Sequence, residues 1–148
     1  MQDNRAVHVL NSLIETTLDS AHGYRDAADG ASDPQLKSLF SERANRREEL
    51  AQRLQAEVRS FGAEPERDQS ALGKAHNVFA EIRGKLMGRD DSGVVSEVER
   101  GEDFIKGKFE EASRDQDLPG HVRALIATEF GTIKAEHDEV SRLKHQMH

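Results

Sequence analysis

The sequence predicts an all-α protein, and three observations lead to that fold class. Apolar residues recur every three or four positions over long stretches, the spacing that places them on one face of a helix. Aromatic residues make up only 5% of the 148 residues, and runs of β-branched residues, which are typical of strands, are missing. Glycine, proline and aspartate interrupt the apolar pattern at four places, so the chain divides into five helical segments.

The first two segments are predicted to be long helices joined by the turn GASDP. The first helix is expected from about Asp3 to Asp29. Its inner face would contain Val7, Leu10, Ile14, Thr17, Ala21, Tyr24 and Ala28. The second helix is expected from Pro34 to about Phe61, with Asp33 as its cap and Gly62 beyond its end. Its inner face would contain Leu36, Phe40, Ala44, Arg47, Leu50, Leu54, Val58 and Phe61.

The other three segments are a short helix and two long ones. They are expected over about Ala71 to Met87, Val94 to Arg114 and Pro119 to Gln146, with Asp91 or Ser92 as the cap of the middle one. That helix would turn Val94, Val98, Glu102, Ile105, Phe109 and Ala112 inward. The last helix would turn in Val122, Ile126, Phe130, Ile133, His137, Val140 and Leu143. We therefore predict one domain over residues 1–148, an antiparallel four-helix bundle whose third arm is broken into two helical segments.

Composition argues against several classes of function. Without cysteine the chain has no disulfide, no thiol nucleophile and no zinc–thiolate site. Its net charge of −7 argues against nucleic acid as a partner. The first residues keep polar side chains within their apolar part, so we expect no signal peptide and a cytoplasmic location. The short helix is basic and amphipathic, which would suit an anionic membrane surface, but packing across the end of the bundle explains it more simply.

Four polar residues interrupt the inner faces near the middle of the long helices: Thr17, Arg47, Glu102 and His137. Antiparallel packing would bring them to similar heights. A buried carboxylate such as Glu102 needs a metal, a basic side chain or a proton, because burying an isolated charge is prohibitive. Di-metal bundles solve this with one Glu from each of two helices and a Glu-x-x-His from each of the other two. The carboxylates neutralise the metal, and the histidine three residues on faces the same cavity.

Three segments of the sequence are similar to a known group of proteins. LIETTLDSAHGYRDAA resembles the first helix of bacterioferritin-type ferritin-like proteins, GEDFIKGKFEEA their third helix and TIKAEHDEVSRL their fourth. Over essentially the whole chain, the sequence resembles an uncharacterised bacterial family of ferritin-like bundle proteins that is classified as a domain of unknown function. The resemblance implies a ferritin-like four-helix bundle. It places the metal-ligand positions of that bundle on Thr17, Ala44, Arg47, Glu102, Lys134 and His137.

Only Glu102 and His137 match the ligands at these six positions, and two of the others are cations. The sequence therefore departs from the di-iron pattern, and a complete di-metal centre is not expected. Instead we expect Arg47 to bind Glu102 through both guanidinium nitrogens, with Lys134 or His137 as a second contact. The alternative is that Arg47 and Glu102 extend to the rim of the bundle without forming a buried pair.

From these residues we expect a non-catalytic interaction or stress-associated protein that has lost a complete di-metal centre. It would form a homo-oligomer or bind another protein, and it would need no cofactor. The alternative is a metal-binding ferritin-like protein that holds iron, manganese or zinc at an altered site around Glu102 and His137. A second possible metal-binding stripe consists of His8, Glu15, Asp19 and His22, with Glu99, Asp103 and Glu136 possibly nearby. His145 and His148 could bind metal adventitiously.

Overall fold

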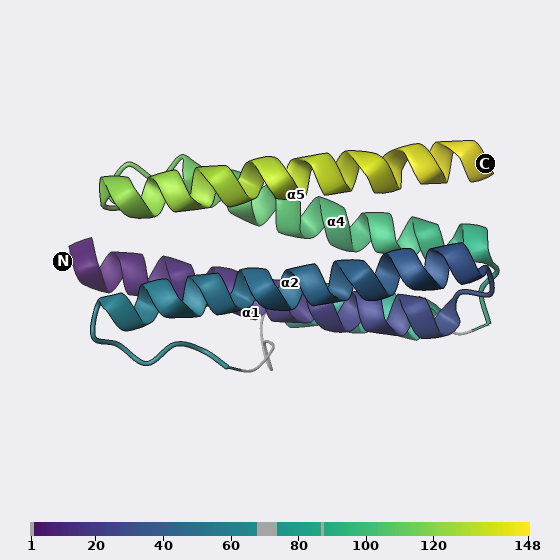
Figure 1. The fold of residues 1–148 in the computed structure, drawn as a ribbon, viewed down its shortest axis with the longest axis horizontal. Coiled ribbons are helices and arrows are strands. Elements are labelled where there is room, and N and C mark those ends of the chain that lie inside the picture. The colour runs from purple at the N-terminus through teal and green to yellow at the C-terminus, as the bar shows by residue number, and fades with distance from the viewer. Residues whose placement is uncertain (1, 68–73, 87) are drawn as a thin grey trace.

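The computed structural model describes residues 2–67, 74–86 and 88–148, and all regular structure within them is helical. Four long helices lie side by side (Figure 1). They are α1 (Gln2–Gly30), α2 (Pro34–Ser60), α4 (Asp91–Ser113) and α5 (Gly120–Met147). A short helix, α3 (Lys74–Leu86), lies against α1 and α4. The all-α fold class is thus confirmed, while the expected ends of the short helix at Ala71 and Met87 lie outside the described residues. None of the described helices is both long enough and apolar enough to cross a membrane.

The third arm of the bundle differs from the expectation. It consists of α4 alone, whose 23 residues span roughly 35 Å at 1.5 Å per residue. Because α2 and α4 run in the same direction, the chain between them returns along the length of the bundle, and α3 belongs to this return (Figure 1). α3 therefore packs beside α4, rather than preceding it end to end as the other half of one arm.

The start of α2 follows the sequence expectation closely. The Asp33 side chain caps the helix by accepting a hydrogen bond from the Gln35 N–H at 2.8 Å, and Pro34 occupies the first helical position. Beyond the other end of α2, Gly62 has a φ of 77°, a conformation that favours glycine. Both boundaries of this helix were therefore readable from local chemistry.

The start of α4 corrects the expected cap. Asp90, rather than Asp91 or Ser92, accepts a hydrogen bond from the Gly93 N–H at 2.8 Å. The Asp91 carboxylate instead accepts from the backbone N–H groups of Ser32 at 2.7 Å and Asp33 at 3.0 Å. Asp91 therefore ties the turn between α1 and α2 to the start of α4.

The buried apolar side chains form two clusters, one toward each end of the bundle. The first includes Leu10, Ile14, Leu54, Ile105 and Phe109. The second includes Tyr24, Phe40, Phe79, Val94 and Val140. Between them lies a set of buried polar residues, Thr17, Ser20, Arg43, Arg47, Glu102 and Glu136, which we call the polar layer. Charged and polar side chains therefore separate the two apolar clusters in the middle of the core.

Candidate functional site

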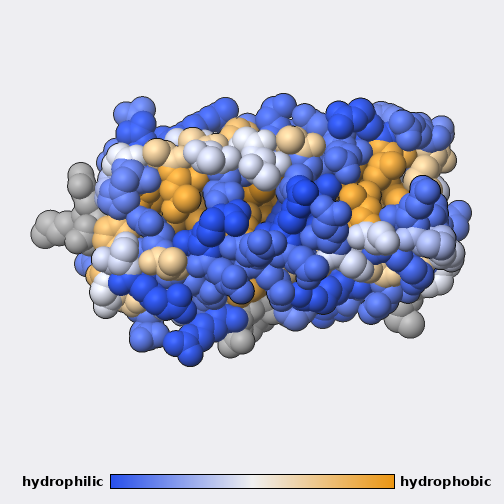
Figure 2. All heavy atoms as spheres, viewed as in Figure 1, coloured by the Kyte–Doolittle hydropathy of each residue, from blue (hydrophilic) through white to orange (hydrophobic). Residues whose placement is uncertain are grey.

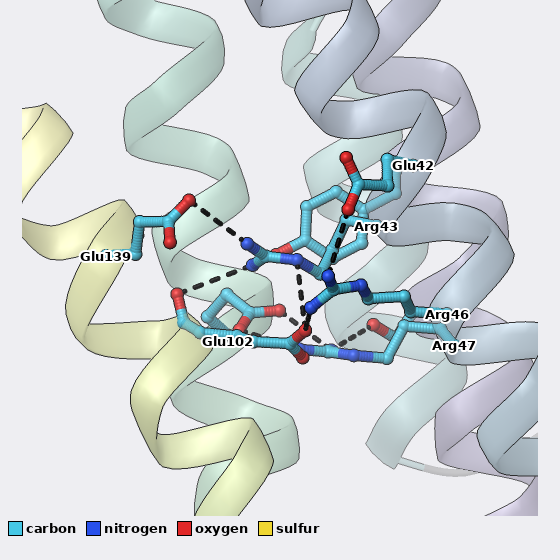
Figure 3. Close-up of polar contacts among 9 residues, drawn as sticks. Glu42, Arg43, Arg46, Arg47, Glu102 and Glu139 are labelled. Carbon is cyan, nitrogen blue, oxygen red and sulfur yellow. Dashed lines mark hydrogen bonds and ion pairs between the residues drawn. The ribbon is translucent and has the colours of Figure 1, made fainter.

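The centre of the polar layer is an ion pair between α2 and α4. Arg47 Nη1 donates to Glu102 Oε1 at 2.8 Å, and Nη2 donates to Glu102 Oε2 at 2.9 Å. The two side chains point toward one another (Figure 3), and each is only 1% exposed. Two parallel charge-assisted bonds use the planar fork of arginine and fix both its position and its orientation.

The same guanidinium also reaches α1 and α5. Nη1 of Arg47 donates to Ser20 Oγ at 2.7 Å, and Nη2 donates to Glu136 Oε1 at 3.0 Å. Arg47 thus contacts three other helices from its place on α2. Burial is the largest single influence on the pKa of Arg47 and would lower it, but the acidic neighbours of Arg47, with the charge of Glu102 first among them, together outweigh burial and raise the pKa above its ordinary value. The guanidinium therefore stays charged inside the bundle.

Two further arginines of α2 hold the second oxygen of Glu136. Arg43 Nε lies 3.3 Å from Glu136 Oε2, and Arg46 Nη1 donates to the same oxygen at 3.2 Å. Arg43 also donates to Glu139 Oε1 on α5 at 3.3 Å (Figure 3). The layer thereby extends from the buried centre to the surface between α2 and α5.

Tyr24 on α1 lies where the polar layer meets the apolar cluster that contains Phe40 and Val140. Its hydroxyl accepts a hydrogen bond from Arg43 Nη1 at 3.3 Å, and the guanidinium carbon of Arg47 lies 5.4 Å from the centre of its ring. Burial, and next the negative charge of Glu102, raise the pKa of Tyr24 well above its usual value. Tyr24 is therefore a neutral hydrogen-bonding group whose ring packs against two cations.

Charge is balanced among the buried arginine and glutamate side chains of the layer. Arg43 and Arg47 supply two positive charges, and Glu102 and Glu136 supply two negative charges. The cavity that adjoins Glu102 and Tyr24 has a volume of about 20 Å³, which is room for about one water molecule. Chemically, the arrangement fixes the relative positions of four helices, and this cavity offers no space for a substrate.

Lys134 does not belong to this layer, contrary to the expectation that it contacts Glu102. Its side chain is 55% exposed, and its ammonium donates to Asp138 on the same helix at 3.2 Å. The reason is the rotation of α5 about its axis. The buried side chains of α5 are Val122, Ile126, Glu129, Ile133, Glu136 and Val140. Glu136 takes the inward place that the sequence interpretation gave to His137, and Lys134 points outward.

His137 instead connects α4 and α5 near the surface. Its Nε2 lies 2.6 Å from Asp103 Oδ1, and its Nδ1 lies 3.0 Å from Asp138 Oδ1. Burial would lower the pKa of His137, but the hydrogen bonds to Asp138 and Asp103 outweigh it and raise the pKa. His137 and Glu102 therefore have different partners, and the structure does not bring them together in one site.

The other candidate metal ligands are not grouped into one site. His8 and His22 are exposed, whereas Glu15 is half-buried, and burial, followed by the charges of Glu66 and Asp19, raises the pKa of Glu15. The exposed His148 ring accepts or donates a hydrogen bond with Ser92 Oγ at 2.8 Å. Within the described part of the chain, no three histidine, aspartate or glutamate side chains are grouped so that they could hold a metal ion.

Sequence reasoning did not single out Ser20, Arg43 and Glu136 as members of the layer. Thr17 was expected in the layer and is buried there, and its hydroxyl donates a hydrogen bond to the Leu13 carbonyl of its own helix at 2.7 Å. The available signal was the spacing of Arg43 and Arg47, one helical turn apart on α2, and of Glu129 and Glu136, one heptad apart on α5. Both spacings place charged residues on one helix face.

Comparison with known proteins gives one match. The model of a family described as Domain of unknown function (DUF2383) matches residues 5–115. No curated protein and no solved structure matches the chain. The matched region includes Arg47 and Glu102 and ends before α5, so Glu136 and His137 lie outside it.

Proposed function

Because the chain belongs to the DUF2383 family, whose function its description leaves open, we propose a function from the geometry of its own site. The protein is a non-catalytic helical bundle that acts by binding another protein molecule, including a second copy of itself. Its polar layer does the work that a di-metal centre does in a ferritin-like bundle, which is to neutralise carboxylates buried between the helices. The arrangement of the four long helices is consistent with a ferritin-like bundle.

The observation that carries this proposal is the position of the Arg47 guanidinium between Glu102 and Glu136, 2.8 Å and 3.0 Å from their nearest oxygens. A metal ion bound by these carboxylates would have to replace a cation that already makes four short hydrogen bonds. Replacing it would leave a charged guanidinium buried beside the metal, at a large electrostatic cost. A metal ion and the Arg47 guanidinium therefore cannot both lie between these two carboxylates.

A catalytic role has little support in this layer. Catalysis needs a reacting atom placed next to the acid, base or nucleophile, with space for a substrate. Here Glu102 is enclosed and Glu136 is largely buried, and the oxygens of both carboxylates accept hydrogen bonds from arginine. A binding role uses the outer surfaces of the helices instead, and the layer supports it by holding those surfaces in one fixed arrangement.

Elemental analysis of protein purified without a histidine tag tests the metal-free centre. We expect a fully helical protein with far less than one iron, manganese or zinc ion per chain. A stoichiometric metal that disappears in Glu102→Ala would contradict the proposal. Sedimentation velocity over a range of protein concentrations tests the binding role, and we expect self-association that strengthens as concentration rises.

The second candidate function is metal binding by His137 with one carboxylate, Asp103 or Asp138, because each of these carboxylates lies within 3.0 Å of a ring nitrogen of His137. This candidate predicts that metal is lost in His137→Ala but kept in Glu102→Ala. Our proposal predicts the same low metal content in the parent protein and in both variants. The two variants therefore separate a surface site from a central one.

A further inference from the structure

The two long grooves of the bundle are closed in different ways. The groove between α2 and α5 is crossed by the chain's own ion pairs, such as Arg53 with Glu129 and Arg46 with Glu136. On this face, hydrophobic atoms lie in separate patches between charged side chains (Figure 2). The groove between α1 and α4, which we call the α1–α4 groove, is covered instead by α3, which packs against both of these helices. α3 is therefore a cover on the bundle rather than one of its four walls.

The α1–α4 groove is shaped for the apolar face of α3. That face consists of Phe79, Ile82 and Leu86, which are all buried. Glycines on both walls of the groove face Phe79. A Cβ added to Gly23 would lie 3.5 Å from its ring, and one added to Gly101 would lie 3.1 Å from it. A side chain at either position would narrow the groove, so the two glycines make room for an aromatic ring from a third helix.

At its edges, α3 is held by exposed ion pairs. Arg83 Nε donates to Asp26 Oδ2 on α1 at 2.9 Å, and Glu81 lies 3.3 Å from Arg100 on α4. All four side chains are at least 36% exposed, so these pairs contribute little to stability. A helix of 13 residues is also marginal by itself. We therefore expect α3 to leave its groove more readily than a long helix leaves the bundle.

Departure of α3 exposes two surfaces at once, the α1–α4 groove and the apolar face of α3. These surfaces are complementary, because they pack together in the structure. The α3 of a second copy has the same sequence, so it restores the buried contacts of Phe79 and the pair between Arg83 and Asp26. Any other helix would have to reproduce this spacing. A second copy is therefore the occupant to which the groove is already matched.

The connection between α3 and α4 restricts where the second copy can lie. α3 ends at Leu86 and α4 begins at Asp91. A chain of this length spans at most about 17 Å. α3 can therefore reach a second groove only if the ends of the two bundles at which α4 begins lie together. When each copy gives its α3 to the other, the contact is two-fold symmetric and closes as a dimer.

Gly88 lies in the turn that keeps α3 beside α4 of its own chain. Its φ is 74°, a conformation that favours glycine. A Cβ at Gly88 would meet no atom within 4 Å, so a larger residue would strain the backbone without a steric clash. Exchange of α3 between chains opens this turn and releases the strain. The balance between monomer and exchanged dimer should therefore depend on the residue at position 88.

We propose that α3 is an exchangeable helix, which leaves the α1–α4 groove of its own chain and binds in the groove of a second copy. This inference rests on the binding role proposed above, and it names the surface and the partner. The exchanged dimer repeats the α3 contacts of the monomer. Its population is therefore set by the turn at Gly88 and by the protein concentration.

Matched valine variants test the role of the turn. Gly88→Val strains the turn between α3 and α4. Gly62→Val strains the end of α2, where φ is 77° and a Cβ again meets no atom within 4 Å. Exchange releases only the first strain. In sedimentation velocity we expect Gly88→Val to strengthen the dimer at least about tenfold, because a left-handed conformation is costly for any residue with a side chain. Gly62→Val should leave the dimer unchanged.

Cross-linking tests the exchange itself, because the parent chain has no cysteine. Asp26→Cys and Arg83→Cys are made as separate proteins, since these two side chains meet in the structure. They are mixed, unfolded in urea and refolded together at a concentration at which the parent is dimeric, and a short bis-maleimide is added. We expect a covalent heterodimer, which requires α3 of one chain in the groove of the other. Asp26→Cys mixed with Gly107→Cys, on the exposed part of α4, is the control and should stay unlinked.

A parent dimer that gives no such heterodimer would overturn the inference while keeping the proposed binding role. Equal effects of valine at positions 88 and 62 would also contradict it. Parent and Gly88→Val proteins that both stay monomeric at all concentrations would overturn exchange and self-association together. Stoichiometric metal lost in Glu102→Ala would contradict the metal-free centre whatever α3 does. The failures of the two proposals are therefore distinguishable.

Discussion

Two ion pairs on α2 have nearly the same geometry and very different surroundings. Arg47 binds Glu102 through two nitrogens at 2.8 Å and 2.9 Å, and Arg53 binds Glu129 through two nitrogens at 2.7 Å and 3.0 Å. The Arg47 side chain is 1% exposed, whereas that of Arg53 is 51% exposed. Water can replace a lost partner at the outer pair but not at the inner one. Burial, rather than bond length, therefore decides what each pair contributes.

The largest expected effect comes from breaking the inner pair. Arg47→Met keeps an apolar chain in the core but leaves the Glu102 charge without its guanidinium. We expect the free energy of unfolding to fall by about 3–5 kcal/mol, measured by urea denaturation. A melting temperature that is unchanged or raised would contradict the idea that Glu102 is left as a stranded buried charge.

The outer pair is the matched comparison. Arg53→Met removes the same type of group from the same helix. Glu129 is itself only 9% exposed, but it lines an open hollow between α2 and α5, so water can reach its carboxylate once Arg53 is shortened. We expect a loss of only about 0–1 kcal/mol in the same urea experiment. A loss as large as that of Arg47→Met would show that exposure does not distinguish the two pairs.

His137 adds a titratable pair of intermediate burial to the comparison, since its side chain is 12% exposed. Its pKa in the folded protein is raised above 6.5, so the folded state holds the proton more tightly than the unfolded state. The resulting stability is fully present below about pH 6.5 and is lost as the pH rises through the raised value.

We therefore expect the parent protein to exceed His137→Gln in unfolding free energy by more at about pH 5.5 than at about pH 8.5. Urea denaturation at both pH values measures this difference. The variant serves as its own control for other titrating groups. An equal difference at both pH values would mean that protonated His137 does not strengthen the contact between α4 and α5.

The helices and most of their buried faces could be predicted from sequence, because apolar residues recur there without interruption. On α2 and α4 the apolar spacing predicted that Arg47 and Glu102 face inward, and the structure places them side by side, although the same spacing did not single out Arg43. On α5 the sequence interpretation turned Phe130 inward and did not consider Glu129. The structure buries Glu129 instead, because Arg53 of α2 pairs with it, and no pattern within α5 reveals that partner.

The position of α3 was also beyond the sequence pattern. Its apolar face predicts burial but not the surface that covers it. The glycines at 23 and 101 make room for Phe79 between α1 and α4, yet neither residue indicates its partner by spacing alone. The sequence pattern therefore did not predict contacts between residues far apart in the chain. Local chemistry was sufficient to predict most helix ends.

The central claim is that the protein's own cation, Arg47, neutralises Glu102 at the middle of the bundle. A double-mutant cycle of Arg47→Met, Glu102→Gln and the combined variant measures this interaction directly through unfolding free energies. We expect the combined variant to be more stable than the sum of the two single losses implies, with an interaction energy of about 1.5–3 kcal/mol. Losses that simply add, within about 0.5 kcal/mol, would contradict the claim.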